Sequence, residues 1–172
     1  MPVKALRVPF FSHLDETSGY KSSVLASVGM CLSFYGMPSK ILAADLLQRS
    51  NNRLWFPLTI FNLKSLIDSY LICRDTPTVC GTLKDLRLAI DEQQPCILHG
   101  FFDRFGHVIV VKGYTSYGLI VNDAAGEWSK QGYRIDLNGE GAIYTYDQIS
   151  QLCSPESAAN PRHLCFHRVA KV

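Results

Sequence analysis

The spacing of apolar residues changes near Pro95, and this change limits the folds that the chain can adopt. Before Pro95, apolar residues recur three and four positions apart in four segments, which is typical of helices. After it, β-branched runs such as "HVIVVKGY" and "GLIVND" flank the turn signal "TSYG". A helical first half followed by a stranded second half predicts an α+β fold, with N-terminal helices packed on a C-terminal antiparallel sheet.

The residues that flank the helical segments indicate where each helix begins. The first helix is expected at about Ser23 to Tyr35, with Ser22 or Ser23 as its cap and Gly36 at its end. "SKILAADLLQR" predicts a second helix capped by Ser39, and residues 59–71 predict a third. "GTLKDLRLAIDEQ" predicts a fourth, capped by Thr82.

The remaining segments predict an arm and several strands. Residues 5–12 read as an extended arm, and "CILHGFF" reads as a short strand ahead of the hairpin. "GAIYTYDQI" begins extended and ends in a helical turn, and "HLCFHRV" reads as a last strand.

Length and charge exclude several classes of protein. The 172 residues suit one domain, spanning 1–172, and a formal net charge of +2 without a dense Lys/Arg cluster argues against nucleic-acid binding. No apolar run approaches the roughly 20 residues that span a bilayer, and the N-terminus lacks the features of a signal peptide. We therefore expect a cytoplasmic protein.

The cysteines predict core packing, and no metal site is expected. None of the six forms a C-x-x-C pair, and three lie within apolar runs, where they are expected as buried free thiols: Cys31, Cys73 and Cys96. His163, Cys165 and His167 share one face of the last strand, but a fourth zinc ligand is not evident. Asp15 and Glu16 are interpreted as solvated loop acids. No cofactor is expected.

The predicted hairpin places a histidine near an aspartate. His107 opens one strand and Asp123 closes the next, so either of two registers centred on the turn brings them within a few residues at the open end. An aspartate beside a histidine fixes the imidazole tautomer and stabilises its cation. The pair therefore predicts a functional dyad, which becomes a nucleophile site if a helix N-terminus lies nearby.

Five segments together resemble a known family. "VPFFSHLDE", "KSSVLASVGMCLSFYG", "QQPCILHGFF", "GHVIVVKGY" and "GLIVNDAAGEW" are similar to papain-like cysteine peptidases related to the bacteriocin-processing, double-glycine leader peptidases. The resemblance runs from Val8 to about Ile149 and is greatest to the stand-alone bacterial and phage forms. It implies a papain-like peptidase fold and acyl transfer at peptide or amide bonds.

The resemblance also implies roles for particular residues. His107 corresponds to the general base, Asp123 to its orienting partner, and Ser23 to the position of the nucleophilic cysteine, seven residues before Met30. His13 replaces a glutamine that assists the oxyanion, and Ala124 replaces a proline. His99 and Trp55 are further candidates for the cleft.

Three explanations of Ser23 remain open. It can be an engineered Cys→Ser change, a natural serine in an inactive peptide-binding relative, or a working nucleophile driven by His107. Accordingly, the expected partner is a peptide or, in a phage lysis enzyme, a peptidoglycan stem peptide. Cys31 is no substitute, because it lies about two helical turns further along.

Overall fold

The computed structural model describes residues 3–15, 17, 19–20, 22–50, 60–102, 106–154 and 163–172. Trp55 and Glu16 therefore lie outside the described residues. The helices are α1 (Ser23–Phe34), α2 (Ser39–Arg49), α3 (Ile60–Asp68), α4 (Leu83–Asp91) and α5 (Tyr146–Cys153). The strands are β1 (Lys4–Ala5), β2 (Cys73–Gly81), β3 (Cys96–Gly100), β4 (His107–Tyr114), β5 (Gly118–Asn122), β6 (Glu127–Ser129), β7 (Gly132–Arg134), β8 (Glu140–Thr145) and β9 (Leu164–Lys171).

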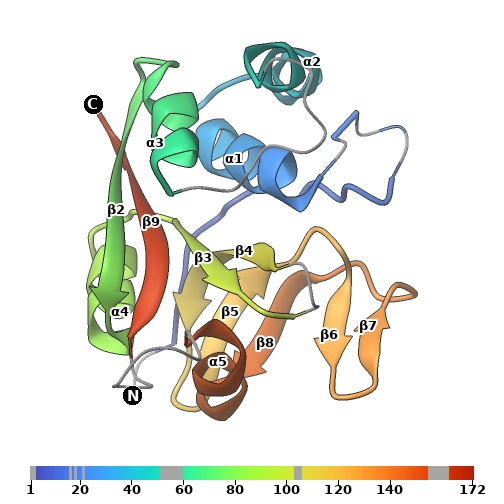
Figure 1. Ribbon diagram of the computed structural model, residues 1–172, viewed down its shortest axis with the longest axis vertical. Coiled ribbons are helices and arrows are strands. Elements are labelled where there is room, and N and C mark those ends of the chain that lie inside the picture. Colours follow the sequence, from blue (N-terminus) through green and yellow to red (C-terminus); the bar gives the residue numbers. More distant parts are fainter. Residues whose placement is uncertain are drawn as a thin grey trace.

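An antiparallel sheet organises the described residues. Its strand order is β2-β9-β3-β4-β5-β8, with the short β1 paired to β4, while β6 and β7 form a separate hairpin. Figure 1 shows α1, α2 and α3 gathered at one end of the molecule, above the strands β3, β4, β5 and β8. The predicted α+β fold, with N-terminal helices on an antiparallel sheet, is confirmed.

Helix α1 forms the centre of the helical layer. The Ser22 hydroxyl oxygen caps it by accepting from the Leu25 N–H, and residues 24–32 are all buried. Gly29 is required there, since a Cβ would lie 2.5 Å from the Tyr20 ring. Gly36, at φ +101°, ends the helix in the backbone conformation that glycine adopts readily. The helix is thereby fixed against β4, which it contacts.

Several elements differ from the sequence-based expectation. Neither strand β2 nor the β6–β7 hairpin was predicted. For β2 the reason is that residues 73–81 contain Pro77 and no alternating apolar pattern. Proline is tolerated there because β2 is an edge strand. The cap of α2 is Pro38, which makes no side-chain bond, and Ser39 is the first helical residue. By contrast, Thr82 caps α4 as predicted.

A buried polar cluster joins β2 to β9. The imidazole Nδ1 of His167 hydrogen-bonds the Asp75 carboxylate, and both side chains are fully buried. The ring of His99 on β3 lies 5.1 Å from that of His167, centroid to centroid. Burial, together with the nearby His167, lowers the pKa of His99 to about 4. His99 is therefore neutral in the folded protein at neutral pH.

This lowered pKa predicts an acid-sensitive fold. Between pH 6.5 and about 4 the unfolded chain binds a proton at His99 that the folded chain does not, so stability falls as the pH falls through this window. The shift corresponds to at most about 3 kcal/mol. We expect His99→Asn to reduce by about that amount the loss of unfolding free energy between pH 7 and pH 4, measured by urea denaturation.

His163→Asn is the matched control, because it also replaces one histidine with asparagine, at a position just before β9. An identical pH dependence in the His99→Asn and original chains would contradict the assignment.

Candidate active site

The structure brings His107 and Asp123 into direct contact. His107 is the first residue of β4, and Asp123 directly follows β5, its neighbour in the sheet. The distance from His107 Nε2 to Asp123 Oδ1 is 2.8 Å, and the side chains are 5% and 0% exposed. Since the Nε2–H group donates a hydrogen bond to the carboxylate, the other ring nitrogen, Nδ1, keeps a lone pair with which to act as a base.

The Asp123 carboxylate is held by further donors. The Ala125 N–H donates to Oδ1 at 3.0 Å, while the hydroxyls of Tyr144 and Tyr133 donate to Oδ2 at 2.8 Å and 3.3 Å. Burial, together with the Asp123 charge, raises the pKa of Tyr144, so its hydroxyl keeps its proton. The carboxylate is thus fixed in position by groups from three segments besides β4.

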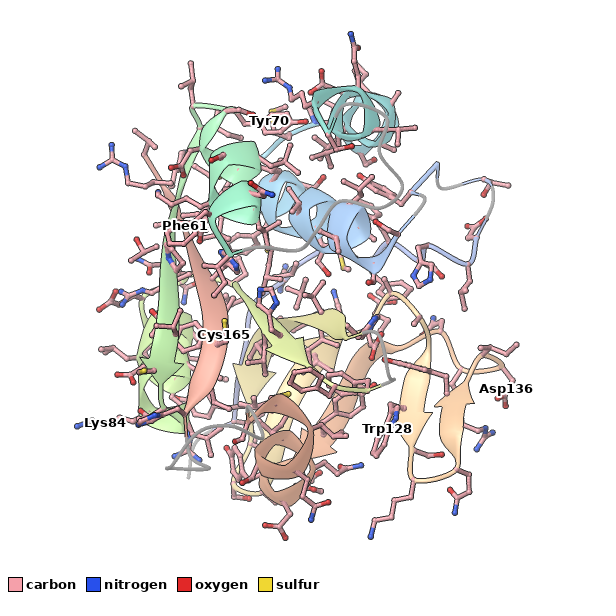
Figure 2. All side chains as sticks on the ribbon, viewed as in Figure 1. Phe61, Tyr70, Lys84, Trp128, Asp136 and Cys165 are labelled. Atoms are coloured by element: carbon pink, nitrogen blue, oxygen red, sulfur yellow. The ribbon has the colours of Figure 1, made fainter. Side chains whose placement is uncertain are left out.

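Aromatic rings surround the imidazole. Phe102 and Tyr133 contact the His107 ring edge-on, at centroid distances of 5.6 Å and 5.4 Å. Trp128, which Figure 2 labels on β6, packs against Phe102 and donates its indole N–H to the Phe102 carbonyl. Sequence reasoning missed Tyr133 and Tyr144; the only available signal was an aromatic residue in each segment after the hairpin. These rings restrict the imidazole to one orientation.

The N-terminal arm is attached to the same site. The Ser12 hydroxyl and the His13 N–H both donate to the Ala124 carbonyl at 3.2 Å. The pKa of His13 is lowered by burial and then by the neighbouring His107, while Asp123 opposes this shift. The Nδ1 atom of His13 is buried without a hydrogen-bond partner. His13 therefore lies near His107 and Asp123.

Ser23 occupies the first position of α1. Because Ser22 is the cap, the Ser23 hydroxyl is not used for capping. Within the described ranges this half-buried side chain has no hydrogen bond, including none to His107. The first N–H groups of a helix lack intrahelical acceptors and can bind a developing negative charge. In Figure 1 this end of α1 lies above the start of β4, an element that α1 contacts.

Other candidates lie apart from the dyad. His99 pairs with Val108 across the β3–β4 ladder, while His107 pairs with Gly100, so His99 and His107 point to opposite faces of the sheet. His99 instead contacts His167. Cys31, Cys73 and Cys96 are buried free thiols, as predicted, and burial raises the pKa of Cys31 well above its usual value.

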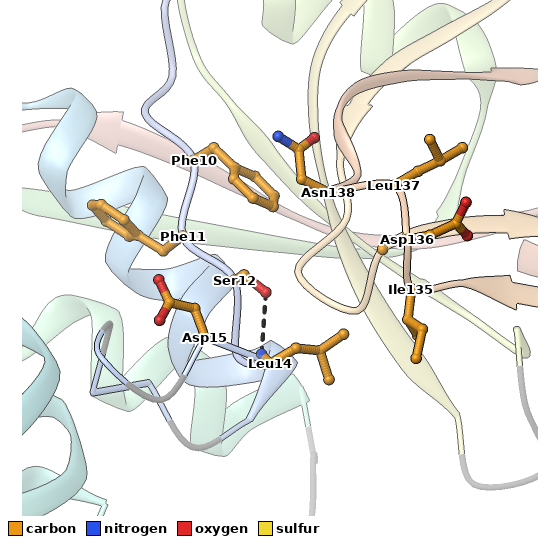
Figure 3. A pocket seen from close by; sticks show the side chains of 10 residues that line it. Phe10, Phe11, Ser12, Leu14, Asp15, Ile135, Asp136, Leu137 and Asn138 are labelled. Carbon is orange, nitrogen blue, oxygen red and sulfur yellow. Dashed lines mark hydrogen bonds between the residues drawn. The ribbon is translucent and has the colours of Figure 1, made fainter.

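A pocket of about 630 Å³ lies between the N-terminal arm and the segment after β7. The arm supplies one wall, and the segment after β7 supplies the other. In Figure 3, Phe10 of the arm and Leu14 just after it face Asn138 and Ile135 across the opening. Ser12, which binds the Ala124 carbonyl, also lines the pocket. Ile135 is 74% exposed, and with Phe10, Phe11, Leu14 and Leu137 it gives the pocket a partly apolar lining.

The described part of the chain contains neither a metal-binding cluster nor a membrane-spanning helix. Its His, Cys, Asp and Glu side chains include no group of three or more arranged to hold a metal ion. None of its helices combines the length and the apolar character that a membrane span requires.

Comparisons with known proteins identify the family and fold of the chain. The model of the Peptidase C39-like family matches residues 5–154. A Bacillus anthracis protein described as a C39-like peptidase is similar in structure, with a TM-score of 0.61, 13% identity and 99% of each chain covered. A double glycine motif protease from an AMS/PCAT transporter, solved with the leader peptide, gives a TM-score of 0.57 and 14% identity over 99% of this chain and 100% of that one. No curated protein matches. With the family model matching most of its length, this chain belongs to the Peptidase C39-like family.

Proposed function

We propose that the chain is a peptidase-type domain whose catalytic residues are Ser23, His107 and Asp123. The observation that carries this proposal is the buried hydrogen bond between His107 Nε2 and Asp123, which leaves Nδ1 available as a base. Membership of the Peptidase C39-like family supports the same chemistry. The reaction is acyl transfer from a peptide or amide bond to the side chain of residue 23.

In the proposed first step, His107 Nδ1 takes the proton of the residue 23 side chain as this side chain attacks the carbonyl carbon. The oxyanion that forms accepts hydrogen bonds from N–H groups at the start of α1, and His13 lies near His107. The imidazolium then donates its proton to the leaving amine, and the C–N bond breaks. Water hydrolyses the acyl intermediate, with His107 again acting as the base.

Serine at position 23 weakens this nucleophile. A hydroxyl is much harder to ionise than a thiol, so Ser23 depends on proton removal by His107 during the attack. Among the described residues, no hydrogen bond joins the two side chains. This observation favours a second candidate function, a domain that binds peptides in the same site without cleaving them. An engineered Cys→Ser change is compatible with either behaviour.

The proposed ligand in both cases is a peptide, bound partly in the pocket between the arm and the segment after β7. The similar transporter protease was solved with its leader peptide, which supports a peptide ligand here, whereas no comparison points to peptidoglycan. Ser12, which lines the pocket, donates a hydrogen bond to the carbonyl of Ala124, the residue after Asp123. On this basis the proposed peptide crosses residue 23 and places an apolar side chain in the pocket.

Restoring a thiol at position 23 tests the proposed catalytic site. We expect Ser23→Cys to react with iodoacetamide at pH 7 at least about tenfold faster than Cys80, because a helix N-terminus and an imidazolium both favour the thiolate. Cys80 is exposed in the same chain and serves as the internal reference. Labelling of each cysteine is measured by peptide mass spectrometry.

Adding His107→Ala to this variant should remove the difference, whereas adding His163→Ala, a histidine distant in sequence and just before β9, should not. Labelling of residue 23 at the rate of Cys80 or slower would count against an activated site. Cleavage of test peptides by the unsubstituted chain would identify a serine nucleophile. Cleavage by the Ser23→Cys variant but not by the unsubstituted chain would indicate that cysteine is the working residue.

A peptide electrophile tests the role of the pocket. In the Ser23→Cys background, we expect Ile135→Asp to slow labelling by peptide aldehydes that carry large apolar side chains about tenfold, which is the effect of losing roughly 1–1.5 kcal/mol of apolar contact. Labelling by iodoacetamide should be unaffected, because this reagent is too small to reach the pocket.

Ile41→Asp is the matched control, since Ile41 lies on α2 and is 71% exposed, compared with 74% for Ile135. Equal slowing by both changes, or by neither, would show that the pocket does not bind the peptide.

A further inference from the structure

Two cysteines lie opposite each other where β2 pairs with β9. Thr78 pairs with Phe166 and Gly81 pairs with Leu164, with an irregularity in the register between them. Two residues of β2, Val79 and Cys80, therefore face the single residue Cys165 on β9. This count, two residues opposite one, defines a β-bulge. Figure 2 labels Cys165 on β9.

The side chains of Cys80 and Cys165 belong to the same face of this strand pair. Leu164 and Phe166 are buried, and a Cβ added to Gly81 would lie 2.2 Å from the Phe166 ring, so these residues share the opposite face. Cys165 alternates with Leu164 and Phe166 along β9 and is half-buried, while Cys80 is exposed. Both thiols are free.

The two thiols are also close enough to interact electrostatically. The pKa of Cys165 is raised to about 11, chiefly by burial and further by Cys80. Residues that face each other in antiparallel strands have Cα atoms about 4.5–5.5 Å apart, and disulfides span Cα distances of about 4.4–6.8 Å. The spacing of antiparallel strands therefore falls within the range that a disulfide spans.

We propose that Cys80 and Cys165 form a reversible cross-strand disulfide, so that the β2–β9 bulge is a site of oxidative modification. The oxidant is a small-molecule disulfide. The exposed Cys80 thiolate attacks it, forming a mixed disulfide and releasing one small thiol. Cys165 then loses its proton to solvent and attacks the Cys80 sulfur, which releases the second small thiol. Two protein thiols are oxidised and one small disulfide is reduced to two thiols.

This disulfide would link the edge strand β2 covalently to β9. β2 pairs only with β9 in the sheet, and its other edge has no strand partner among the described residues. The cross-link closes the chain from residue 80 to residue 165, a stretch that includes both His107 and Asp123. Cross-links that close long loops restrict the unfolded chain most. The oxidised form should therefore open less often at β2 than the reduced form.

The test uses the full chain and oxidised glutathione at pH 8. We expect non-reducing peptide mass spectrometry to find one peptide pair linked through Cys80 and Cys165, which dithiothreitol separates. In Cys165→Ser, glutathione should remain attached at Cys80; in Cys80→Ser, no linked pair should form. Hydrogen exchange of the β2 amides should be at least about tenfold slower in the oxidised chain.

A stable glutathione adduct on Cys80 in the original chain, with no internal link, would overturn the proposal. A disulfide between two chains through Cys80 would also overturn it. Both of these observations use the original chain, so the test does not depend on whether the variants fold.

Discussion

The hydrogen bond between the His107 imidazole and the Asp123 carboxylate is the interaction on which the account depends. It is buried, and Asp123 also accepts from the Ala125 N–H, Tyr144 and Tyr133. One charged group thus joins the start of β4 to the end of β5 and to two later strands. Because Nε2 is engaged, Nδ1 alone can exchange a proton with a substrate. The chemistry proposed for the chain follows from this assignment of the two ring nitrogens.

The second constraint is the position of the N-terminus of α1. Ser22 takes the capping role, so the side chain of residue 23 is available at the point where the helix presents N–H groups without intrahelical acceptors. The core fixes this end, since Gly29 allows Tyr20 to pack directly against the helix backbone. The segment before α1 is bonded to the dyad, because Ser12 and His13 donate to the carbonyl of Ala124, the residue after Asp123.

Local signals predicted the fold class, the caps of α1 and α4 and the nearness of His107 to Asp123, since periodicity and hairpin register depend on short-range geometry. They did not predict β2, whose pairing with β9 joins residues distant in the sequence and whose Pro77 argues against a strand. Nor did they predict Tyr133 and Tyr144, because which residues approach a carboxylate is decided by tertiary packing. For the same reason His99, a cleft candidate by sequence, instead packs against His167.

The most direct test of the central claim is a crystal structure of the Ser23→Cys chain with a bound peptide aldehyde. The account predicts a covalent bond from the residue 23 sulfur to the aldehyde carbon, with His107 Nδ1 within hydrogen-bond distance of the adduct and Nε2 still bonded to Asp123. The aldehyde oxygen should accept from N–H groups at the start of α1. An adduct at another residue, or a residue 23 side chain turned away from His107, would contradict the account.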